Sequence, residues 1–276
     1  MNYELIDSGD QKRFERFGDY KIIRPCSIAI WKPKLKKEIW ADFDFSFSRS
    51  DQNLWTLKKK KPKNFIVKLS DHQFKLLLSD FGHVGIFPEH ELLWSWMENK
   101  IKNENLKNLK ILNLFGYTGA CSIALAKTNS FVCHVDASKP MTLWAKENAK
   151  LNNVKEDKIR WIVDDVMKFL HREVKRNNTY DAIVLDPPTF GRGPKNEIFK
   201  IESDLIELLF LCKKLLKKDF KFLTLSCHTP GYTSQVLTNL LLQVFGNKKI
   251  VTDEILIKSK NSFPLPMGSF ARIEND

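Results

Sequence analysis

Hydrophobic residues follow two different patterns along the chain, and the pattern changes near residue 105. Before residue 100, short apolar or alternating stretches separated by charged turns predict β-strands, among them 27–31, 65–69 and 74–78. After Pro88, early acidic residues followed by apolar ones predict a helix. A polar stretch over 99–108 is typical of a domain boundary. We therefore expect a small β-rich domain over residues 1–104 that ends in a helix.

From residue 110 onward, short apolar runs alternate regularly with helical periods. The predicted strands are 111–114, 131–135, 160–163, 182–185 and 222–225, with two last strands near Ile255 and Phe270. The predicted helices are 120–127, 139–151, 166–174, 205–216 and 234–244. This alternation is typical of βαβ units that build a parallel sheet. We expect residues 105–276 to form an α/β domain, a Rossmann-like sheet with helices on both faces.

The charge balance adds a candidate partner to this picture. The 276 residues include 45 Lys+Arg against 33 Asp+Glu, a net charge of +12. Basic surface gains affinity for phosphates by releasing counterions, so the charge indicates RNA or DNA, although many lysine-rich proteins never bind nucleic acid. A lysine-rich run at 58–63 is either a solvated hairpin loop or a loop that contacts phosphates.

The cysteines and the apolar runs bear on compartment. Five widely scattered cysteines without a C-x-x-C pair indicate neither a disulfide framework nor a zinc site, and we expect no metal. No uninterrupted apolar run reaches the roughly 18 residues of a membrane span, and the first 20 residues contain no apolar signal region. We expect a cytoplasmic protein with no membrane partner. The oligomeric state is not predictable from these features.

A glycine-containing turn follows the first strand of the α/β region. It contains Phe115, Gly116, Tyr117, Thr118 and Gly119. In a doubly wound fold this turn lets a nucleoside cofactor approach the backbone, which a Cβ at position 119 would obstruct. The turn lacks the full G-x-G-x-x-G pattern, so by itself it is equally compatible with a simple strand-to-helix connection.

Acidic residues stand at the ends of the next strands. Asp136 closes the second strand, where a carboxylate can accept hydrogen bonds from two ribose hydroxyls. Asp164 and Asp165 end the third strand, where an adenine amino group would lie. A nicotinamide-dependent oxidoreductase would also use the acid at 136, so these residues predict a nucleoside pocket without choosing the cofactor.

The end of the fourth strand distinguishes between the possible cofactors. There Asp186 is followed by Pro187, Pro188, Thr189 and Phe190. Consecutive prolines remove two backbone donors and stiffen the loop, leaving carbonyl groups and a side chain at the carboxyl edge of the sheet. Such a loop suits a planar amine or base, with the phenylalanine available for stacking. It favours a methyltransferase over an oxidoreductase.

These motifs together carry a family resemblance over roughly residues 80 to 272. The matching pieces are 113–119, 135–138, 164–166, 186–190 and 265–271. The chain resembles bacterial class I methyltransferases that use S-adenosylmethionine (SAM) and are related to the 23S ribosomal RNA enzymes that form 5-methylcytosine or N7-methylguanine. Tyr117 and Asn113 depart from generic methyltransferases, but both departures are typical of this family.

The resemblance implies a site, a cofactor and an acceptor. The cofactor is SAM, and the acceptor is a base in RNA, with ribosomal RNA as the expected partner. Implied cofactor-binding residues are His83, Phe115, Tyr117, Thr118, Gly119, Asp136, Ala137, Asp164 and Asp165. Implied catalytic residues are Asp186, Pro187, Pro188, Phe190 and Cys227.

Two of these residues and the acceptor class stay open at the sequence level. Cys227 is either a nucleophile that adds to carbon 6 of cytosine or a buried strand residue, and His83 is either functional or structural. A segment at 191–195 is expected to be a flexible basic loop that either clamps substrate phosphates or closes over the site once substrate binds, or that simply lies exposed. Methylation of a small molecule or protein is an alternative function. A non-catalytic RNA-binding protein with a decayed cofactor pocket is another.

Overall fold

The computed structural model describes residues 3–49 and 54–275, which pack as two compact units. The first unit comprises Met1–Glu91 together with Leu256–Met267, and the second comprises Leu92–Ile255 together with Gly268–Asp276. The boundary lies earlier than the expected one after residue 104, because most of the helix before that point belongs to the second unit. The division into domains over residues 1–104 and 105–276 stays a prediction.

The first unit is built on a five-stranded sheet in which strand order follows chain order. Its strands are β1 (Tyr3–Gly9), β2 (Lys12–Phe17), β3 (Tyr20–Pro25), β4 (Phe45–Ser48) and β5 (Leu54–Leu57). A separate hairpin pairs β6 (Ile66–Leu69) with β7 (His72–Lys75), and the short helices are α1 (Lys37–Ala41) and the 3-10 turn η1 (Pro88–His90). Alternate residues of β4 and β6 are buried, as expected for strands with one face on a core.

The predicted strand at 27–31 is wrong, because that segment is irregular. Its backbone forms hydrogen bonds with a neighbouring turn and not with another strand. The carbonyls of Ala29 and Trp31 accept hydrogen bonds from the N–H groups of Gln11 and Asp10 in the β1–β2 turn. Segment Leu256–Met267 packs in the same region, where Ile257 and Leu265 join a small core with Leu5.

The second unit contains a seven-stranded sheet with the order β10-β9-β8-β11-β14-β16-β15. The strands are β8 (Lys110–Leu114), β9 (Phe131–Asp136), β10 (Ile159–Val163), β11 (Ala182–Leu185), β14 (Phe222–Cys227), β15 (Ile250–Ile257) and β16 (Leu265–Glu274). Strands β10, β9, β8, β11 and β14 are parallel, whereas β16 pairs antiparallel with β14. Strand order reverses between β8 and β11, where open α/β sheets bind their ligands.

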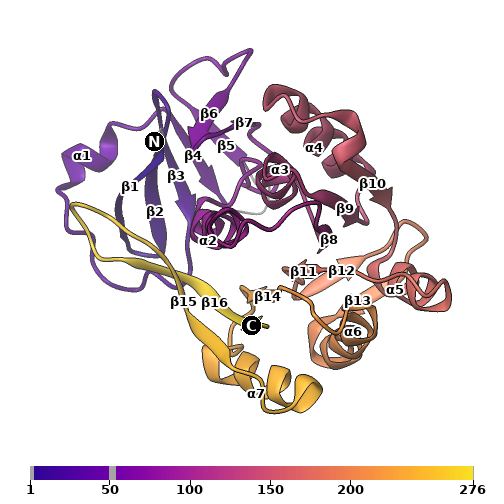
Figure 1. Ribbon diagram of the computed structural model, residues 1–276. Coiled ribbons are helices and arrows are strands. Elements are labelled where there is room, and N and C mark those ends of the chain that lie inside the picture. The colour runs from indigo at the N-terminus through magenta and orange to yellow at the C-terminus, as the bar shows by residue number, and fades with distance from the viewer. Residues whose placement is uncertain (1–2, 50–53, 276) are drawn as a thin grey trace. The chain divides into compact units, whose positions relative to one another are not determined.

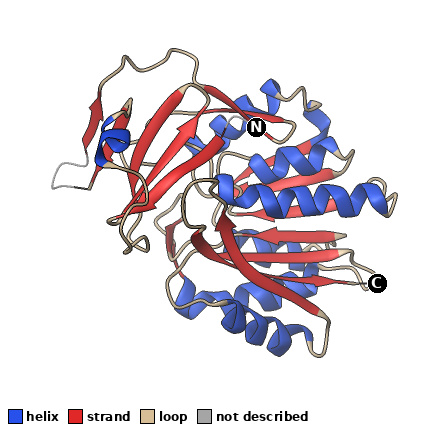
Figure 2. Ribbon diagram, turned by 90° about the vertical axis from the view of Figure 1, so that its left-hand side faces the viewer, coloured by secondary structure: helices blue, strands red, loops and turns tan. Residues whose placement is uncertain are grey.

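Helices cover both faces of this sheet (Figure 2). They are α2 (Glu91–Asn103), α3 (Ala120–Lys127), α4 (Lys139–Leu151), α5 (Val166–Lys175), α6 (Ile201–Leu215) and α7 (Ser234–Phe245), with the 3-10 turn η2 (Glu156–Lys158) before β10. Figure 1 shows α3 and α4 on one face and α5, α6 and α7 on the other. The central strands β11 and β14 are buried along their whole length, which explains their continuous apolar runs.

The predicted α/β class is therefore confirmed, as are the alternating strands and helices between residues 110 and 245. Among the helices that the structure describes, none combines the length and the apolar character required to cross a bilayer. A feature that the sequence analysis did not predict is the small hairpin of β12 (Phe190–Arg192) and β13 (Ile198–Lys200).

Candidate functional site

Four of the singled-out segments meet at one edge of the sheet in the second unit. They follow the carboxyl ends of β8, β9, β10 and β11, which are parallel neighbours in the order β10-β9-β8-β11. Parallel strands end at the same edge, so the segments 115–119, 136–138, 164–165 and 186–190 share it. The reversal of strand order between β8 and β11 falls in the middle of this edge.

The turn after β8 has an unusual backbone. Phe115 and Tyr117 have φ values of 57° and 50°, in the left-handed region, and Gly119 has a φ of 86°. A non-glycine residue in that region costs on the order of 1–3 kcal/mol, and such strain clusters at ligand sites. Hydrogen bonds hold the turn, since Gly116 N–H donates to the Val135 carbonyl and Gly119 N–H to the Gly116 carbonyl, both at 3.0 Å.

Both glycines of this turn lie against side chains. A Cβ on Gly119 would lie 2.9 Å from Cβ of Ala145 on α4, and a Cβ on Gly116 would lie 2.4 Å from ring atoms of His134. Neither distance is compatible with ordinary packing. Close packing inside the protein is therefore sufficient reason for glycine at both positions, in addition to any approach by a ligand.

A buried polar chain lies behind the turn and was missed by the sequence analysis. Asn113 Nδ2 donates to Ser122 Oγ at 2.8 Å, and Ser122 Oγ lies 3.0 Å from Nδ1 of His134. Burial lowers the pKa of His134 to about 3, so the ring is neutral at physiological pH. The signal in the sequence was the presence of Asn113 and His134 inside otherwise apolar strands.

Asp136 joins the turn to the start of α4. Its Oδ2 accepts the Tyr117 N–H at 2.8 Å and its Oδ1 accepts the Ser138 N–H at 2.8 Å. Burial raises the pKa of Asp136 above its ordinary value, against the lowering effect of these two hydrogen bonds. Each carboxylate oxygen has a second lone pair, so the group retains acceptor capacity for ribose hydroxyls.

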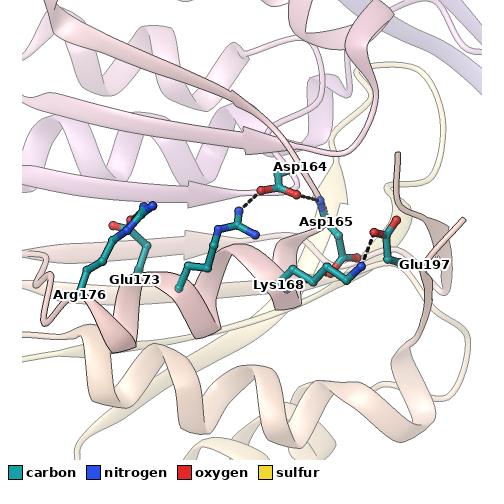
Figure 3. Close-up of polar contacts among 7 residues, drawn as sticks. Asp164, Asp165, Lys168, Glu173, Arg176 and Glu197 are labelled. Carbon is teal, nitrogen blue, oxygen red and sulfur yellow. Dashed lines mark hydrogen bonds and ion pairs between the residues drawn. The ribbon is translucent and has the colours of Figure 1, made fainter. Parts of the chain in front are cut away.

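The two acids after β10 have different surroundings (Figure 3). Asp164 Oδ1 accepts the Asp165 N–H at 2.9 Å, and its Oδ2 forms an ion pair with Arg172. Asp165 is buried and caps α5, because its Oδ1 accepts the Lys168 N–H at 2.9 Å. Asp165 Oδ2 has no hydrogen-bond partner among the described residues, so this oxygen keeps its capacity to accept a hydrogen bond from a ligand.

The Asp-Pro-Pro loop after β11 is fixed to the neighbouring strand end. Asp186 Oδ1 accepts a hydrogen bond from Ser226 Oγ at 2.8 Å and lies 3.6 Å from His228 Nε2. The Thr189 and Thr229 hydroxyls lie 2.8 Å apart. These contacts hold the carboxylate in one orientation at the edge where the strand order reverses.

Phe190 begins the β12–β13 hairpin, so residues 191 and 192 of the expected loop at 191–195 are strand, whereas 193–195 lie in the hairpin turn. The hairpin is held by Glu197, which accepts the Lys195 N–H at 2.8 Å and forms a 2.6 Å ion pair with Lys168 of α5 (Figure 3). Phe190 itself is 49% exposed, with the Arg192 guanidinium 5.8 Å from its ring centroid. An exposed aromatic ring beside a cation offers a planar group a stacking surface.

Cys227 lies at the end of β14 with no exposed surface and belongs to the main hydrophobic core of the second unit. Burial raises the pKa of its thiol above the ordinary value, and hydrogen bonds from Thr229 offset this only in part. Nucleophilic cysteines have lowered pKa values and accessible sulfur atoms. The surroundings of Cys227 therefore favour a structural role.

His83 lies in the first unit, where its ring centroid is 5.5 Å from that of Phe87 and its backbone N–H donates to Ser79 Oγ. Burial and nearby arginines lower the pKa of His83 to about 4, so it is neutral near pH 7. Its predicted contact with a cofactor stays a prediction. The same holds for the roles of Thr118 and Ala137, which lie in the turns after β8 and β9.

Sequence comparisons place this edge in a known context. A family model described as RNA cap guanine-N2 methyltransferase matches residues 108–250. The ribosomal RNA large subunit methyltransferase K/L of Pseudoalteromonas translucida is 33% identical over 164 residues, which are 59% of this chain and 22% of that protein. The protein of the same description from Shewanella amazonensis is 35% identical over 146 residues, 52% of this chain and 20% of that one. The chain thus spans about a fifth of the length of these curated relatives.

A comparison with solved structures covers more of the chain. The crystal structure of the SAM-dependent methyltransferase from Agrobacterium tumefaciens matches with a TM-score of 0.95 and 33% identity, over 100% of this chain and 91% of that one. SMU.776, crystallised in complex with SAH (S-adenosylhomocysteine), matches with a TM-score of 0.79 and 18% identity, over 99% of this chain and 75% of that one. The second likeness concerns the fold alone.

Proposed function

Because the chain belongs to the SAM-dependent methyltransferase family that the RNA cap guanine-N2 methyltransferase model represents, we propose that its acceptor is a base in RNA. Ribosomal RNA is the first candidate, since the curated relatives are described as ribosomal RNA large subunit methyltransferases. The observation that carries the proposal is the exposed Phe190, two residues after the Asp186-Pro187-Pro188 segment. We infer in addition that the enzyme works in the cytoplasm, where its RNA acceptor would be found.

The residues of the sheet edge fit SAM. Asp136 would hold the ribose, because its carboxylate is aimed by two backbone N–H groups and keeps free lone pairs. Asp165 would meet the adenine amino group through its second oxygen. The strained turn with Phe115, Tyr117 and Gly119 would line the methionine part. When bound, SAM would supply an electrophilic methyl group on a sulfonium, and these residues would position it for transfer.

The acceptor would lie between Phe190 and Asp186. Stacking on the exposed ring orients the plane of the base, and the carboxylate of Asp186 accepts a hydrogen bond from its amino or ring N–H. Ser226 and His228 fix that carboxylate, so little reorganisation is needed when the base enters. If the acceptor nitrogen must lose a proton on methylation, Asp186 is the group placed to take it.

The chemistry around Cys227 supports a nitrogen acceptor. Carbon 5 of cytosine becomes nucleophilic only after a thiolate adds to carbon 6, which requires an accessible thiol of lowered pKa. Cys227 is fully buried and its pKa is raised. An exocyclic amine or a ring nitrogen attacks the methyl group directly, and positioning then accounts for most of the rate.

The test is transfer of tritiated methyl from SAM to three pools: ribosomal RNA lacking modifications, a protein extract, and a small-molecule extract. We expect label in RNA, and mass spectrometry of its nucleosides would then identify a base methylated on nitrogen. Label confined to the protein or small-molecule pool would show that RNA is not the acceptor. Calorimetry with SAH serves as the control for an intact cofactor site.

A further inference from the structure

A lysine-rich loop in the first unit has no part in the function described so far. We call residues 58–63 the lysine loop; it joins β5 to β6. Residues 54–69 contain six lysines (Lys58, Lys59, Lys60, Lys61, Lys63 and Lys68) and no acidic residue, so this stretch carries +6 of the net charge of +12. Half of the excess positive charge of the chain is thus concentrated in 16 consecutive residues.

The first two lysines anchor the base of the loop. Lys58 Nζ donates to the Ala41 carbonyl at 2.6 Å and lies 4.1 Å from the ring centroid of Phe43. Lys59 Nζ forms a 2.7 Å ion pair with Asp44, a nearly buried carboxylate. These contacts fix where the loop leaves the sheet and neutralise only one of its charges.

The remaining lysines are available to a partner. Lys60, Lys61 and Lys63 are exposed, and none forms an ion pair within residues 3–49 and 54–275. Pro62 between them restricts the backbone, which limits the collapse of the loop onto its own strands. Three unpaired ammonium groups held within a few residues repel one another, and a bound polyanion relieves this repulsion by replacing many counterions.

Apolar side chains lie on the strands at both ends of the loop. Leu54 and Leu57 on β5 are 55% and 44% exposed, and Ile66 on β6 is 41% exposed. Among the strands that the structure describes, β5 is also the last of its sheet and pairs only with β4. Exposed apolar side chains beside unpaired cations are typical of an interaction surface and not of a surface that only needs hydration.

We propose that the lysine loop binds the phosphates of the RNA acceptor, an inference that rests on the proposed function. Lysine is a compact point charge on a flexible stem, so it suits phosphate contacts and not the reading of bases. The contact is therefore independent of nucleotide sequence and steeply dependent on salt. The apolar side chains of β5 and β6 then lie against riboses and base faces.

The experiment compares two triple variants of the full chain. One is Lys60→Gln, Lys61→Gln and Lys63→Gln. The control is Lys150→Gln, Lys155→Gln and Lys175→Gln, three exposed lysines of the second unit that also lack an ion pair among the described residues. Both remove three positive charges, so any difference reflects position. Fluorescence anisotropy with a ribosomal RNA fragment would give Kd between 50 and 200 mM salt.

We expect the loop variant to bind RNA on the order of tenfold more weakly than the control, with a slope of log K against log salt that is smaller by about 2, since each single-stranded phosphate contact contributes ~0.7. SAH affinity and thermal midpoint should stay unchanged in both variants. A single Lys61→Glu variant, which leaves the other lysines of the loop in place, should also weaken RNA binding.

Four outcomes would overturn the proposal. Equal weakening in the two triple variants would show that only net charge matters. If the protein methylates RNA and the loop variant binds RNA normally, the proposed role of the lysine loop is wrong and the proposed function stands. If the unaltered protein binds SAH but neither binds nor methylates RNA, both the proposed function and the role of the lysine loop are wrong. Loop-dependent binding to vesicles with 30% phosphatidylserine, without RNA binding, would assign the surface to a membrane.

Discussion

Gly116 and His134 illustrate how tightly single atoms constrain the turn after β8. A methyl group on residue 116 would lie 2.4 Å from the imidazole, which is fully buried and fixed by Ser122. The turn is the part that moves under such pressure, because its backbone is already strained at Phe115 and Tyr117. Its displacement would carry the Tyr117 N–H away from Asp136.

Gly116→Ala is therefore expected to weaken SAH binding by at least about tenfold and to destabilise the fold by about 1–3 kcal/mol, the usual cost of overpacking. Calorimetry and urea unfolding measure the two effects. The double variant Gly116→Ala, His134→Ala should recover part of the SAH affinity, because the smaller side chain makes room for the new methyl. Unchanged SAH affinity in Gly116→Ala would contradict the packing argument.

Asp186 and Cys227 form a second test at single-residue scale. Asp186→Asn should lower the rate of methyl transfer by roughly 10²–10⁴-fold while SAH affinity is retained, because the amide cannot take a proton from the acceptor. Cys227→Ala should retain most of the transfer rate and lose about 1 kcal/mol of stability, because it removes only a buried thiol. Loss of transfer in a folded Cys227→Ala protein would restore the covalent mechanism.

At the scale of elements, β2 and β3 contain an ion cluster where a hydrophobic core is the usual solution. The Glu15 carboxylate accepts hydrogen bonds from Nε and Nη2 of Arg24 at 2.8 Å each and from the Tyr3 hydroxyl at 3.0 Å. Glu15 is fully buried. Burial by itself would raise the pKa of Glu15, but the charges of Arg13 and Arg24 outweigh it and lower that pKa below its ordinary value.

Glu15→Gln should reduce the free energy of unfolding at pH 7 by about 3–5 kcal/mol, because it leaves two buried guanidinium groups without their anion. A lowered carboxyl pKa stabilises the fold above the unfolded-state value and ceases to do so as pH falls through the folded-state value. The difference between the two proteins should therefore shrink on acidification below about pH 4.3. Denaturant titrations at pH 7 and at stepwise lower pH measure it; a constant difference would contradict the assignment.

Strands were predictable from the sequence where both of their faces are buried. Parallel strands covered on both faces appear as continuous apolar runs, and acids at their ends share an edge by topology, which is how Asp136, Asp165 and Asp186 could be found. Asn113 and His134 stand out as polar residues in apolar strands, but their link through Ser122 could not be predicted, because it depends on the register of β8 with β9. The strand with Arg13 and Glu15 was hidden for the same reason, since their burial depends on Arg24 in β3.

At the scale of the whole molecule, the proposed cofactor residues at the sheet edge (Asp136, Asp165 and the turn at 115–119) belong to the second unit, whereas the lysine loop belongs to the first. SAM contacts are assigned to the edge of the seven-stranded sheet, whereas the greatest local concentration of charge lies beside the five-stranded sheet. The two activities, cofactor binding and polyanion binding, should therefore respond independently to salt, because only the second involves release of many counterions.

Hydrogen exchange followed by mass spectrometry tests this division. At 100 times its Kd, SAH stabilises the state that binds it by about 2.7 kcal/mol. We expect slower exchange in the turn at 115–119 and at the start of α5, where the ligand would contact backbone, and unchanged exchange in β1–β3. Protection confined to the five-stranded sheet would contradict the location of the cofactor site.

The boundary between the units is crossed three times by the chain, at 91/92, 255/256 and 267/268. Each unit is thus discontinuous in sequence, and no single cut of the polypeptide or single exchange of gene segments can supply either one whole. Replacing either unit with a segment from an unrelated gene would need joins at all three of these positions. The two units are consequently expected to be inherited as a pair, and a gene fragment limited to residues 108–250 would encode a sheet without its antiparallel strand β16.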